Sequence, residues 1–399
     1  MAGKPLSVAV IGGGIGGLAA ALSLLRVGLD VHVYEQAREL SDIGAGLQIS
    51  PNASRLLRRL GIVEALDING VRPVGVHQRR WDDGRTLQRA PLGPEIEAAF
   101  GAPYYHFHRA DLVGVLAAAM PPGRVHVGHR LREIDDLGER VVATFENGAR
   151  IEVDALVGAD GIHSRVRHCL YGPDKPRFTG CVAWRGLVPA DKIAHLDLEV
   201  VSSNWMGPGG HFVHYWVSGR TRHNFVAIVE RDSWTAESWT DRGDIEEVRA
   251  LYAGWHPIVR TLLGSVEETF IWALHDRPAL PRWSTGRCTL LGDACHPMLP
   301  MMAQGAAQAI EDGAALASCL TQGRDDVVAA LARYEGARKA RATRLQDMSA
   351  GNRVRFHYPD GPDQIARDAA MAAGGDRSIT NIGWLYGHDP AAIGESPPT

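Results

Sequence analysis

The first 35 residues place apolar and glycine-rich segments in the order of a β-α-β unit. Residues 7–11 form a short apolar run that predicts a strand, residues 18–27 form an Ala/Leu-rich run that predicts a helix, and residues 30–35 predict a second strand. A secretory or membrane segment is the alternative, because this stretch is largely apolar. Five glycines within residues 12–17 argue against it, since glycine destabilises a continuous hydrophobic helix.

Three of those glycines, Gly12, Gly14 and Gly17, fit the G-x-G-x-x-G spacing of a dinucleotide-binding turn. In that motif the first glycine permits a tight turn, the second lets the backbone approach a pyrophosphate, and the third lets the helix pack close to the strand. The phosphates would meet the free N–H groups at the positive end of the helix. Glu35 ends the second strand, where a carboxylate can bind both ribose hydroxyls of an adenosine, and Gln36 beside it is assigned to the same site.

The middle of the chain changes from alternating strands and helices to a run of strands. Strands are predicted over residues 74–89, 181–188, 199–205, 211–217, 224–230 and 268–272. An antiparallel run inserted between α/β segments indicates a separate substrate domain. We therefore predict a discontinuous nucleotide-binding domain (1–73, 104–177 and 281–324), a β-sheet domain (74–103 and 178–280), and a C-terminal helix and tail (325–399).

Two further strand ends carry carboxylates that suit a cofactor site. Asp160 ends an apolar strand, at the edge where ligands bind in open α/β sheets. Gly292 and Asp293 end another, and Asp293 is placed to bind hydroxyl groups of a cofactor. The loop then leads through Pro300 to Gly305, where a helix of small residues is predicted to run to about residue 320. Its N-terminus could sit against a cofactor ring that becomes anionic.

One predicted strand carries the residues best suited to substrate chemistry. His211, Val213 and Tyr215 lie on one face of it by period-two alternation. A His and a Tyr that face a pocket can handle a phenolic proton, and the alternative is a core pair bonded to the sheet. Trp205 and Arg185 are weaker candidates for the same pocket, and a structural role is the favoured alternative for both.

Loops and helix ends supply the remaining candidates. Gln48 follows glycines that suggest backbone near a ligand; the alternative is a side chain satisfied by neighbouring backbone. The loop that contains Pro297 and Met301 would help to exclude water from a site. Arg109 precedes a predicted helix and could bind cofactor oxygens, the alternative being a surface ion pair with Asp111.

Composition narrows the class of protein. A net charge of −4 without a long basic run indicates neither a nucleic-acid surface nor a polybasic membrane patch. Five cysteines without a C-x-x-C pair suit a cytoplasmic protein and argue against a metal site or a disulfide framework. A thiolate nucleophile at Cys295, beside His296, is disfavoured because nothing supplies an orienting third group.

Three motifs in order resemble those of the single-component, FAD-dependent aromatic-ring hydroxylases, the class A flavoprotein monooxygenases of the p-hydroxybenzoate hydroxylase fold. They are the Gly12 to Gly17 turn with Glu35, the Asp160-Gly161 segment and the Gly292-Asp293-Ala294 segment. Residues 44–52, 108–112 and 292–316 look most like the group of salicylate hydroxylase, 3-hydroxybenzoate 6-hydroxylase and 6-hydroxynicotinate 3-monooxygenase. The resemblance implies an α/β fold, with a Rossmann-like FAD-binding domain, an inserted antiparallel β-sheet substrate domain and a C-terminal helical segment.

The resemblance also implies a reaction. FAD would be bound, NADH or NADPH would bind transiently because only one nucleotide fingerprint is present, and O2 would be the co-substrate. The oxygen would reach a small hydroxylated aromatic acid, similar to salicylate or hydroxybenzoate, from a flavin C4a-hydroperoxide. HFVHY at residues 211–215 is similar to the substrate strand of the group, so His211, relayed through Tyr215, is the expected base.

Several alternatives remain open at this point. A hydroxypyridine hydroxylase of the 6-hydroxynicotinate kind is disfavoured, because Gln48 and Met301 stand where its relatives are expected to have histidines. A tailoring oxygenase or epoxidase with a larger substrate would need no base facing a phenol, and a flavin reductase or sensor would yield no oxygenated product. A plain NAD-dependent dehydrogenase would leave the Asp160 and Asp293 segments without a task. A long helix predicted over residues 325–355 has a basic face that is either solvated or a homodimer contact.

Overall fold

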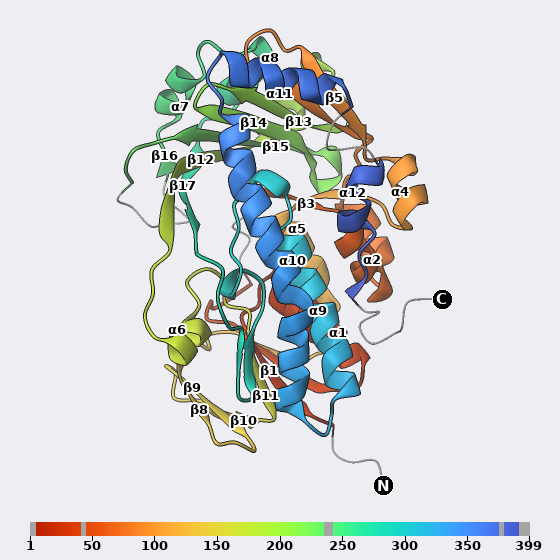
Figure 1. Ribbon diagram of the computed structural model, residues 1–399, viewed down its shortest axis with the longest axis vertical. Helices are drawn as coiled ribbons and strands as arrows, with labels where there is room; N and C mark the ends of the chain where they lie inside the picture. Colours follow the sequence, from red (N-terminus) through yellow and green to blue (C-terminus); the bar gives the residue numbers. More distant parts are fainter. Residues whose placement is uncertain (1–4, 41–44, 235–241, 375–378, 391–399) are drawn as a thin grey trace.

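A six-stranded sheet and an eight-stranded sheet occupy opposite ends of the molecule, and one long helix runs past both (Figure 1). This computed structural model describes residues 5–40, 45–234, 242–374 and 379–390. Gly44, the first residue of the resemblance over residues 44–52, and the end of the predicted tail after residue 390 lie outside the described residues.

The six-stranded sheet is built on the predicted β-α-β unit. Its order is β18-β19-β11-β1-β2-β7, with bounds Ser284–Thr285, Cys288–Leu290, Ala155–Gly158, Ser7–Ile11, Asp30–Tyr34 and Val125–His126. β1 pairs in parallel with both β2 and β11, and β11 pairs in parallel with β19. Because these strands are parallel, their carboxyl ends meet at one edge, which is where the sequence places its glycine turn and its acidic residues.

The eight-stranded sheet joins the early hairpin to the later run of strands. Its order is β16-β17-β12-β15-β14-β13-β4-β5, with bounds Arg242–Gly243, Thr269–Asp276, Arg177–Pro189, Arg222–Glu230, Gly210–Val217, Val201–Gly207, Gly75–Arg80 and Thr86–Pro91. The prediction of an antiparallel sheet holds for every pair except β4 and β13, which are parallel. These two strands are far apart in the chain, so no tight turn imposes an antiparallel direction on them.

Two smaller sheets, twelve α-helices and four short 3-10 helices complete the described structure. β3 (Gly46–Ile49) pairs with β6 (Tyr105–His108), and the other small sheet contains β8 (Leu131–Asp136), β9 (Val141–Phe145) and β10 (Arg150–Val153). The helices α1 to α8 span Ile15–Arg26, Pro51–Arg59, Val63–Asn69, Pro94–Phe100, Arg109–Ala118, Arg165–Tyr171, Ile245–Leu251 and Pro257–Gly264. The helices α9 to α12 span Gly305–Gln322, Val327–Phe356, Pro362–Ala372 and Ile379–Tyr386.

Helices α1 and α9 lie against each other because two glycines leave no side chain between them. A Cβ atom on Gly313 of α9 would lie 2.7 Å from Ala20 Cα of α1, and one on Gly16 would lie 2.9 Å from Ala309 Cβ. The Ala-rich sequences of both helices are buried in the same core as β1 and β11. Helix α1 therefore packs on β1 and β2, and α9 packs at close range on α1.

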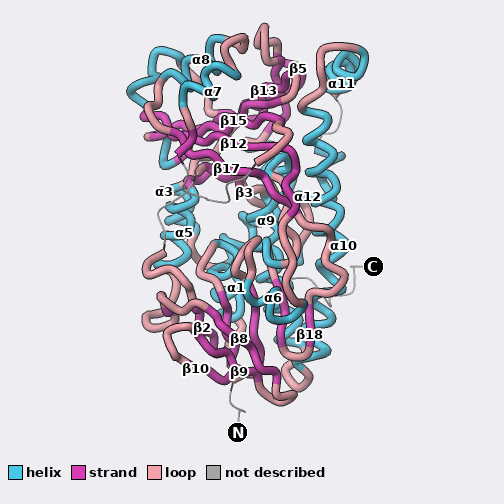
Figure 2. Tube along the Cα trace, turned by 90° about the vertical axis from the view of Figure 1, so that its left-hand side faces the viewer, coloured by secondary structure: helices cyan, strands magenta, loops and turns pink. Residues whose placement is uncertain are grey.

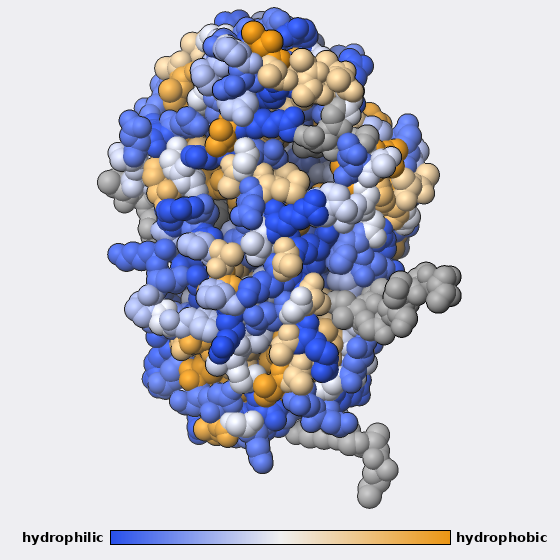
Figure 3. Space-filling model, in the orientation of Figure 1, coloured by the Kyte–Doolittle hydropathy of each residue, from blue (hydrophilic) through white to orange (hydrophobic). Residues whose placement is uncertain are grey.

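Helix α10 links the two ends of the molecule, as Figure 2 shows from the side. After it, α11 packs against β5, and α12 packs against α2 and α4. On the face that carries α10, hydrophilic residues predominate and hydrophobic ones are scattered (Figure 3). Among the described residues, no helix is both long enough and apolar enough to cross a membrane.

Candidate active site

A cavity of about 1320 Å³ extends from the glycine turn to the face of the eight-stranded sheet. At one end it is lined by Gly13 to Gly16 and Glu35, and at the other by residues of β12, β13 and β14. Residues of α10, α11 and α12 also line it, so the C-terminal part of the chain helps to enclose the site. A cavity between a nucleotide-type turn and a second sheet can hold a cofactor and a substrate side by side.

The glycines of the turn do what their spacing predicts. Gly12 has φ +112°, and a Cβ atom there would lie 2.4 Å from the Ala159 carbonyl oxygen. A Cβ atom on Gly17 would lie 1.9 Å from the Gly12 carbonyl oxygen, so only glycine lets α1 approach β1. Gly14 lines the cavity, and no atom lies within 4 Å of where its Cβ would be. The turn therefore leaves open space for a ligand at the N-terminus of α1.

Glu35 borders this space and also holds the turn in place. Its Oε2 accepts a 2.6 Å hydrogen bond from the Gly13 N–H, and its Oε1 accepts one of 2.8 Å from Ala37. Gln36 lines the cavity next to it. Each carboxylate oxygen keeps further lone pairs, so Glu35 can still accept bonds from ribose hydroxyls.

Asp160 borders the cavity, but its carboxylate is engaged locally. It accepts hydrogen bonds from Ser164 Oγ at 2.5 Å and from the backbone N–H groups of Arg165 and Val166 at 2.7 and 3.0 Å. It thus caps α6, and the geometry shows a role in shaping the turn. Arg109 opens α5 and lines the cavity, while Asp111, its expected alternative partner, accepts a bond from Ser218.

The Gly292-Asp293 loop also lines the cavity, close to the glycine turn. Gly292 has φ +59°, and Asp293 faces the cavity, where enclosure by the protein raises the pKa of its carboxyl group. Pro300 and Gly305 also line the cavity, and α9 begins at Gly305. Two helix N-termini, those of α1 and α9, therefore face one cavity, which favours anionic groups there.

A buried ionic cluster supports this loop from behind. His296 Nε2 lies 2.6 Å from Asp312 Oδ2, and Arg338 donates to both Asp312 and Glu311 at 2.8 and 2.6 Å. Despite its burial, Asp312 has a pKa lowered to about 2, since His296 and Arg338 stabilise the carboxylate. Asp312 does orient His296, but burial raises the pKa of the Cys295 thiol well above its usual value, so a thiolate at Cys295 remains disfavoured.

The predicted substrate strand is β14, and its alternation places the expected residues on the cavity. His211, Val213 and Tyr215 line it, whereas Phe212 and Trp216 lie in the apolar core on the opposite face. Burial lowers the pKa of His211 well below 6.5 and raises that of Tyr215 above 10. At neutral pH both side chains are therefore uncharged.

Gln48 lies in the cavity wall and bonds to side chains, not to the backbone partners of its alternative reading. Its Oε1 accepts a 2.8 Å bond from Tyr104 Oη, and its Nε2 donates to Ser202 Oγ at 3.3 Å. Pro297 and Met301 line the cavity nearby. These bonds hold the Gln48 amide in one orientation at the substrate end.

The prediction that Trp205 contacts the substrate is wrong. Trp205 is 1% exposed and lies in the apolar core behind the sheet, with its ring centroid 4.8 Å from that of His256. Its neighbours Ser202 and Asn204 are the β13 residues that line the cavity. Successive residues of β13 point to opposite faces of the sheet, so Trp205 lies on the face away from Ser202 and Asn204.

Several residues of the cavity were missed or ranked low from the sequence. Arg185 was a weak candidate, yet it faces the cavity from β12, with its guanidinium carbon 4.3 Å from the Trp272 ring centroid. Its neighbour Trp184 is in the core, so alternation could have found it. His357 and Trp384 approach the site from the C-terminal segment, where no local pattern indicates what they contact.

The sequence is similar to a known family and to named enzymes. Residues 5–349 match the FAD binding domain family FAD_binding_3. The chain is 42% identical over 387 residues to 3-amino-4-hydroxybenzoate 2-monooxygenase PtnB3 of Streptomyces platensis, with 97% of each chain covered. It is 40% identical over 348 residues to 6-hydroxynicotinate 3-monooxygenase of Pseudomonas fluorescens, covering 86% of this chain and 90% of that one.

A solved structure extends the comparison to the fold. HpxO of Klebsiella pneumoniae, complexed with FAD and uric acid, superposes with a TM-score of 0.85 at 28% identity, with 96% of each chain covered. The open glycine turn, the two helix N-termini and Asp293 fit FAD, because they offer backbone donors to phosphates and an acceptor to hydroxyl groups. The chain belongs to the FAD-binding domain family and is a flavoprotein aromatic-ring monooxygenase that uses FAD, NAD(P)H and O2.

Proposed function

We propose that this enzyme hydroxylates a small aromatic carboxylic acid that already carries a ring hydroxyl group. The observation that carries the proposal is the pairing, on one cavity wall, of a half-buried guanidinium with a buried neutral imidazole. Arg185 of β12 and His211 of β14 face the cavity from the two strands that flank β15. One can bind a carboxylate and the other can accept a phenolic proton.

Arg185 is the evidence that the substrate carries an acidic group. Burial lowers the pKa of its guanidinium to about 10, which still leaves it charged at neutral pH. In the part of the chain that the structure describes, no Asp or Glu forms an ion pair with it, and its Nε has no hydrogen-bond partner. A partly desolvated cation that faces a cavity without a counter-ion is unfavourable, so an anionic substrate group would stabilise this site.

His211 is the evidence that the substrate carries a phenolic hydroxyl group. Its low pKa keeps the ring neutral, so a ring nitrogen can take up a proton when a phenol binds. Loss of that proton raises electron density at the ortho and para carbons of the substrate ring. When bound, FAD would supply the two electrons that activate O2, and O2 would supply the oxygen atom. Gln48, Pro297 and Met301 help to keep water away from the ring.

The relatives suggest which acid to try first. The name of the 42% identical relative specifies 3-amino-4-hydroxybenzoate, a phenolic acid with both groups that the cavity wall can bind. The 6-hydroxynicotinate enzyme is similar at 40% identity, so a hydroxypyridine acid is the second candidate. Both compounds are small acids with an ionisable ring hydroxyl or its pyridone equivalent.

The test is NADH and NADPH oxidation by the FAD-loaded protein against 3-amino-4-hydroxybenzoate, 6-hydroxynicotinate, salicylate, and 3- and 4-hydroxybenzoate, with products identified by mass. We expect at least one acid to stimulate oxidation and to give a product heavier by one oxygen. The carboxamide of that acid is the matched control and should stimulate less. If every small acid is silent and larger phenols give product, the small-acid proposal fails and a tailoring oxygenase replaces it.

A further inference from the structure

The ring nitrogen of His211 that does not face a substrate begins a chain of side chains that ends at the protein surface. His211 Nδ1 lies 2.7 Å from His357 Nε2, and His357 Nδ1 lies 3.0 Å from Glu230 Oε1. His211 is 2% exposed and the side chain of His357 1%, whereas the side chain of Glu230 is 49% exposed. The chain therefore connects a buried cavity with solvent.

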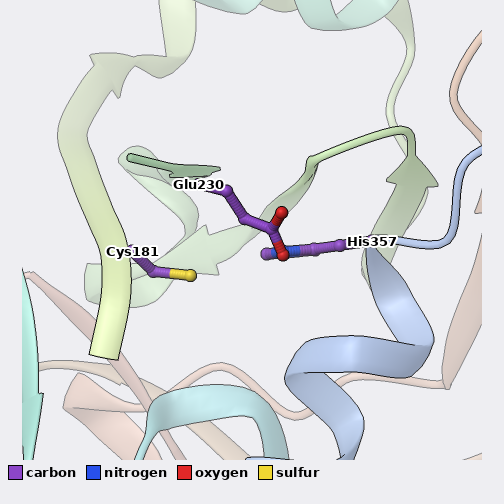
Figure 4. A group of neighbouring side chains, drawn as sticks. All are labelled: Cys181, Glu230 and His357. Atoms are coloured by element: carbon purple, nitrogen blue, oxygen red, sulfur yellow. The ribbon is translucent and has the colours of Figure 1, made fainter. Parts of the chain in front are cut away.

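Figure 4 shows the outer half of this chain. Glu230, at the end of β15, points its carboxylate toward the ring of His357, which follows α10. The backbone of His357 is anchored too, because its carbonyl accepts a 3.1 Å bond from the Gly209 N–H. Phe356 packs edge-on against His211, with ring centroids 5.3 Å apart, and shields the inner half.

The hydrogen bonds allow one assignment of protons. The Glu230 carboxylate can only accept, so His357 carries its proton on Nδ1. A neutral His357 then has a bare Nε2, which can only accept, so His211 carries its proton on Nδ1. A neutral His211 is left with a bare Nε2, which is the atom that can take a proton from a substrate.

The surroundings keep both rings neutral. Burial is the largest cause of the lowered pKa of His357, with Arg353 of α10 acting in the same direction and Glu230 opposing it. Burial and His357 together lower the pKa of His211. Cys181 of β12 also faces this group as a neutral thiol, since burial raises its pKa to about 11.

The same cluster could be read as a metal site, because Cys181, Glu230 and His357 lie close together (Figure 4). Both nitrogens of His357 are already engaged, one with Glu230 and one with His211. Cys181 would also have to lose a proton that its environment retains. The hydrogen-bonded chain therefore explains the cluster better than a metal ion does.

We propose that His357 and Glu230 are positioning residues that hold His211 with a bare Nε2 toward the substrate and carry the phenolic proton to solvent. The proposal rests on the proposed function, because it requires a phenolic substrate. The substrate O–H bond breaks as His211 Nε2–H forms, and His211 Nδ1–H breaks as His357 Nε2–H forms. His357 Nδ1–H then breaks as a Glu230 O–H forms, and Glu230 releases the proton to water. No oxidation or reduction takes place in these steps.

The test uses oxidised, FAD-loaded protein without NAD(P)H, so that no turnover occurs. 3-Amino-4-hydroxybenzoate, or whichever acid of the panel yields product, is mixed with the protein in weakly buffered solution that contains a pH-indicator dye. Stopped-flow absorbance then measures the rate of proton release. We expect the unchanged protein to release about one proton for each ligand bound, as a base that ionises its substrate must.

Two variants separate the two tasks of the chain. In His357→Gln the amide can still accept from His211 and donate to Glu230, but it cannot pass a proton, so the ligand should bind while proton release slows about tenfold or more. Glu230→Gln removes the group that can only accept and lies at an exposed position, so it should fold and slow release by a smaller factor. Glu267→Gln, the same change at another exposed glutamate of the same domain, is the matched control and should change nothing.

The outcomes separate this inference from the proposed function. Equal release rates in His357→Gln and the unchanged protein, or an equal loss in Glu267→Gln, would overturn the relay. Ligand binding and product formation without proton release by the unchanged protein would overturn the relay and leave the hydroxylase intact. If the unchanged protein neither binds nor hydroxylates any phenolic acid, the proposed function fails and the relay fails with it.

Discussion

The two ends of the cavity are built in different ways. The nucleotide end depends on the backbone. Side chains at positions 12 and 17 would clash with carbonyl oxygens, and Gly14 borders open space that a ligand can occupy. The substrate end depends on side chains, such as Arg185 and His211, that arrive from strands far apart in the chain. A site made by the backbone tolerates almost no change at its glycines, whereas a site made by side chains can change its substrate without losing its fold.

The largest effect should come from the backbone end. Gly17→Ala places a Cβ atom 1.9 Å from the Gly12 carbonyl oxygen, so α1 must move away from β1. We expect a loss of about 3 kcal/mol or more in the free energy of unfolding, together with loss of the yellow cofactor. Gly14→Ala is the matched control: it should fold normally and weaken FAD binding alone. Denaturant unfolding and flavin absorbance measure both, and equal stabilities for the two variants would contradict the comparison.

At the substrate end, His211→Ala should leave the fold and the FAD content unchanged. Product formation should fall by about a hundredfold, since a positioned base contributes at least that much, and NADH oxidation should become uncoupled from product. His214→Ala is the control, because His214 is on the same strand but its ring bonds to His223 behind the cavity face. That variant should lower stability without uncoupling. Full coupling in His211→Ala would remove the base assignment.

Arg185→Met should weaken recognition of the substrate's carboxylate. The KM for the acid substrate should rise about tenfold, which corresponds to the loss of one charge-assisted contact, while the KM for the carboxamide should barely move. Steady-state kinetics with both compounds measure the difference. An equal rise for acid and amide would show that Arg185 shapes the cavity without recognising charge.

Acidification should have the smallest effect of these changes, and it should lower the stability of the two ends over different pH ranges. The pKa of His223, in the eight-stranded sheet, is lowered to about 3 by burial, so below about pH 6.5 the unfolded chain takes up a proton that the folded sheet does not. Stability there should fall on the order of 1 kcal/mol per pH unit as the pH drops from 6.5 toward 3. Asp312, whose pKa is lowered to about 2, contributes stability that is complete above its ordinary value of 3.8 and is lost as the pH falls toward 2.

Hydrogen exchange followed along the chain can detect this order. Between pH 6 and pH 4 we expect β14 and β15 to lose protection before β1 and β11 do. His223→Gln should flatten the pH dependence of the sheet, since the glutamine does not titrate. Simultaneous loss of protection at both ends would mean that one cooperative unit spans the molecule.

The same contrast explains what the sequence could predict. The β-α-β unit, the Gly292 loop and helix α9 follow from contiguous patterns, and α9 begins at Gly305 as expected. Alternation along β14 places His211 and Tyr215 together on the cavity wall, but along β13 it does not say which of the two faces borders the cavity, so the sequence could not exclude Trp205. The link between His357 and His211 joins positions 146 residues apart, and no local pattern carries information over that distance.

The contact between α1 and α9 sets a fixed length inside the enzyme. Both helices begin at the cavity, one at Ile15 and the other at Gly305, and the absent side chains of Gly16 and Gly313 hold their axes together. The N-termini of the two helices therefore keep a fixed distance from each other. An extended cofactor that touches both helix N-termini must match this span.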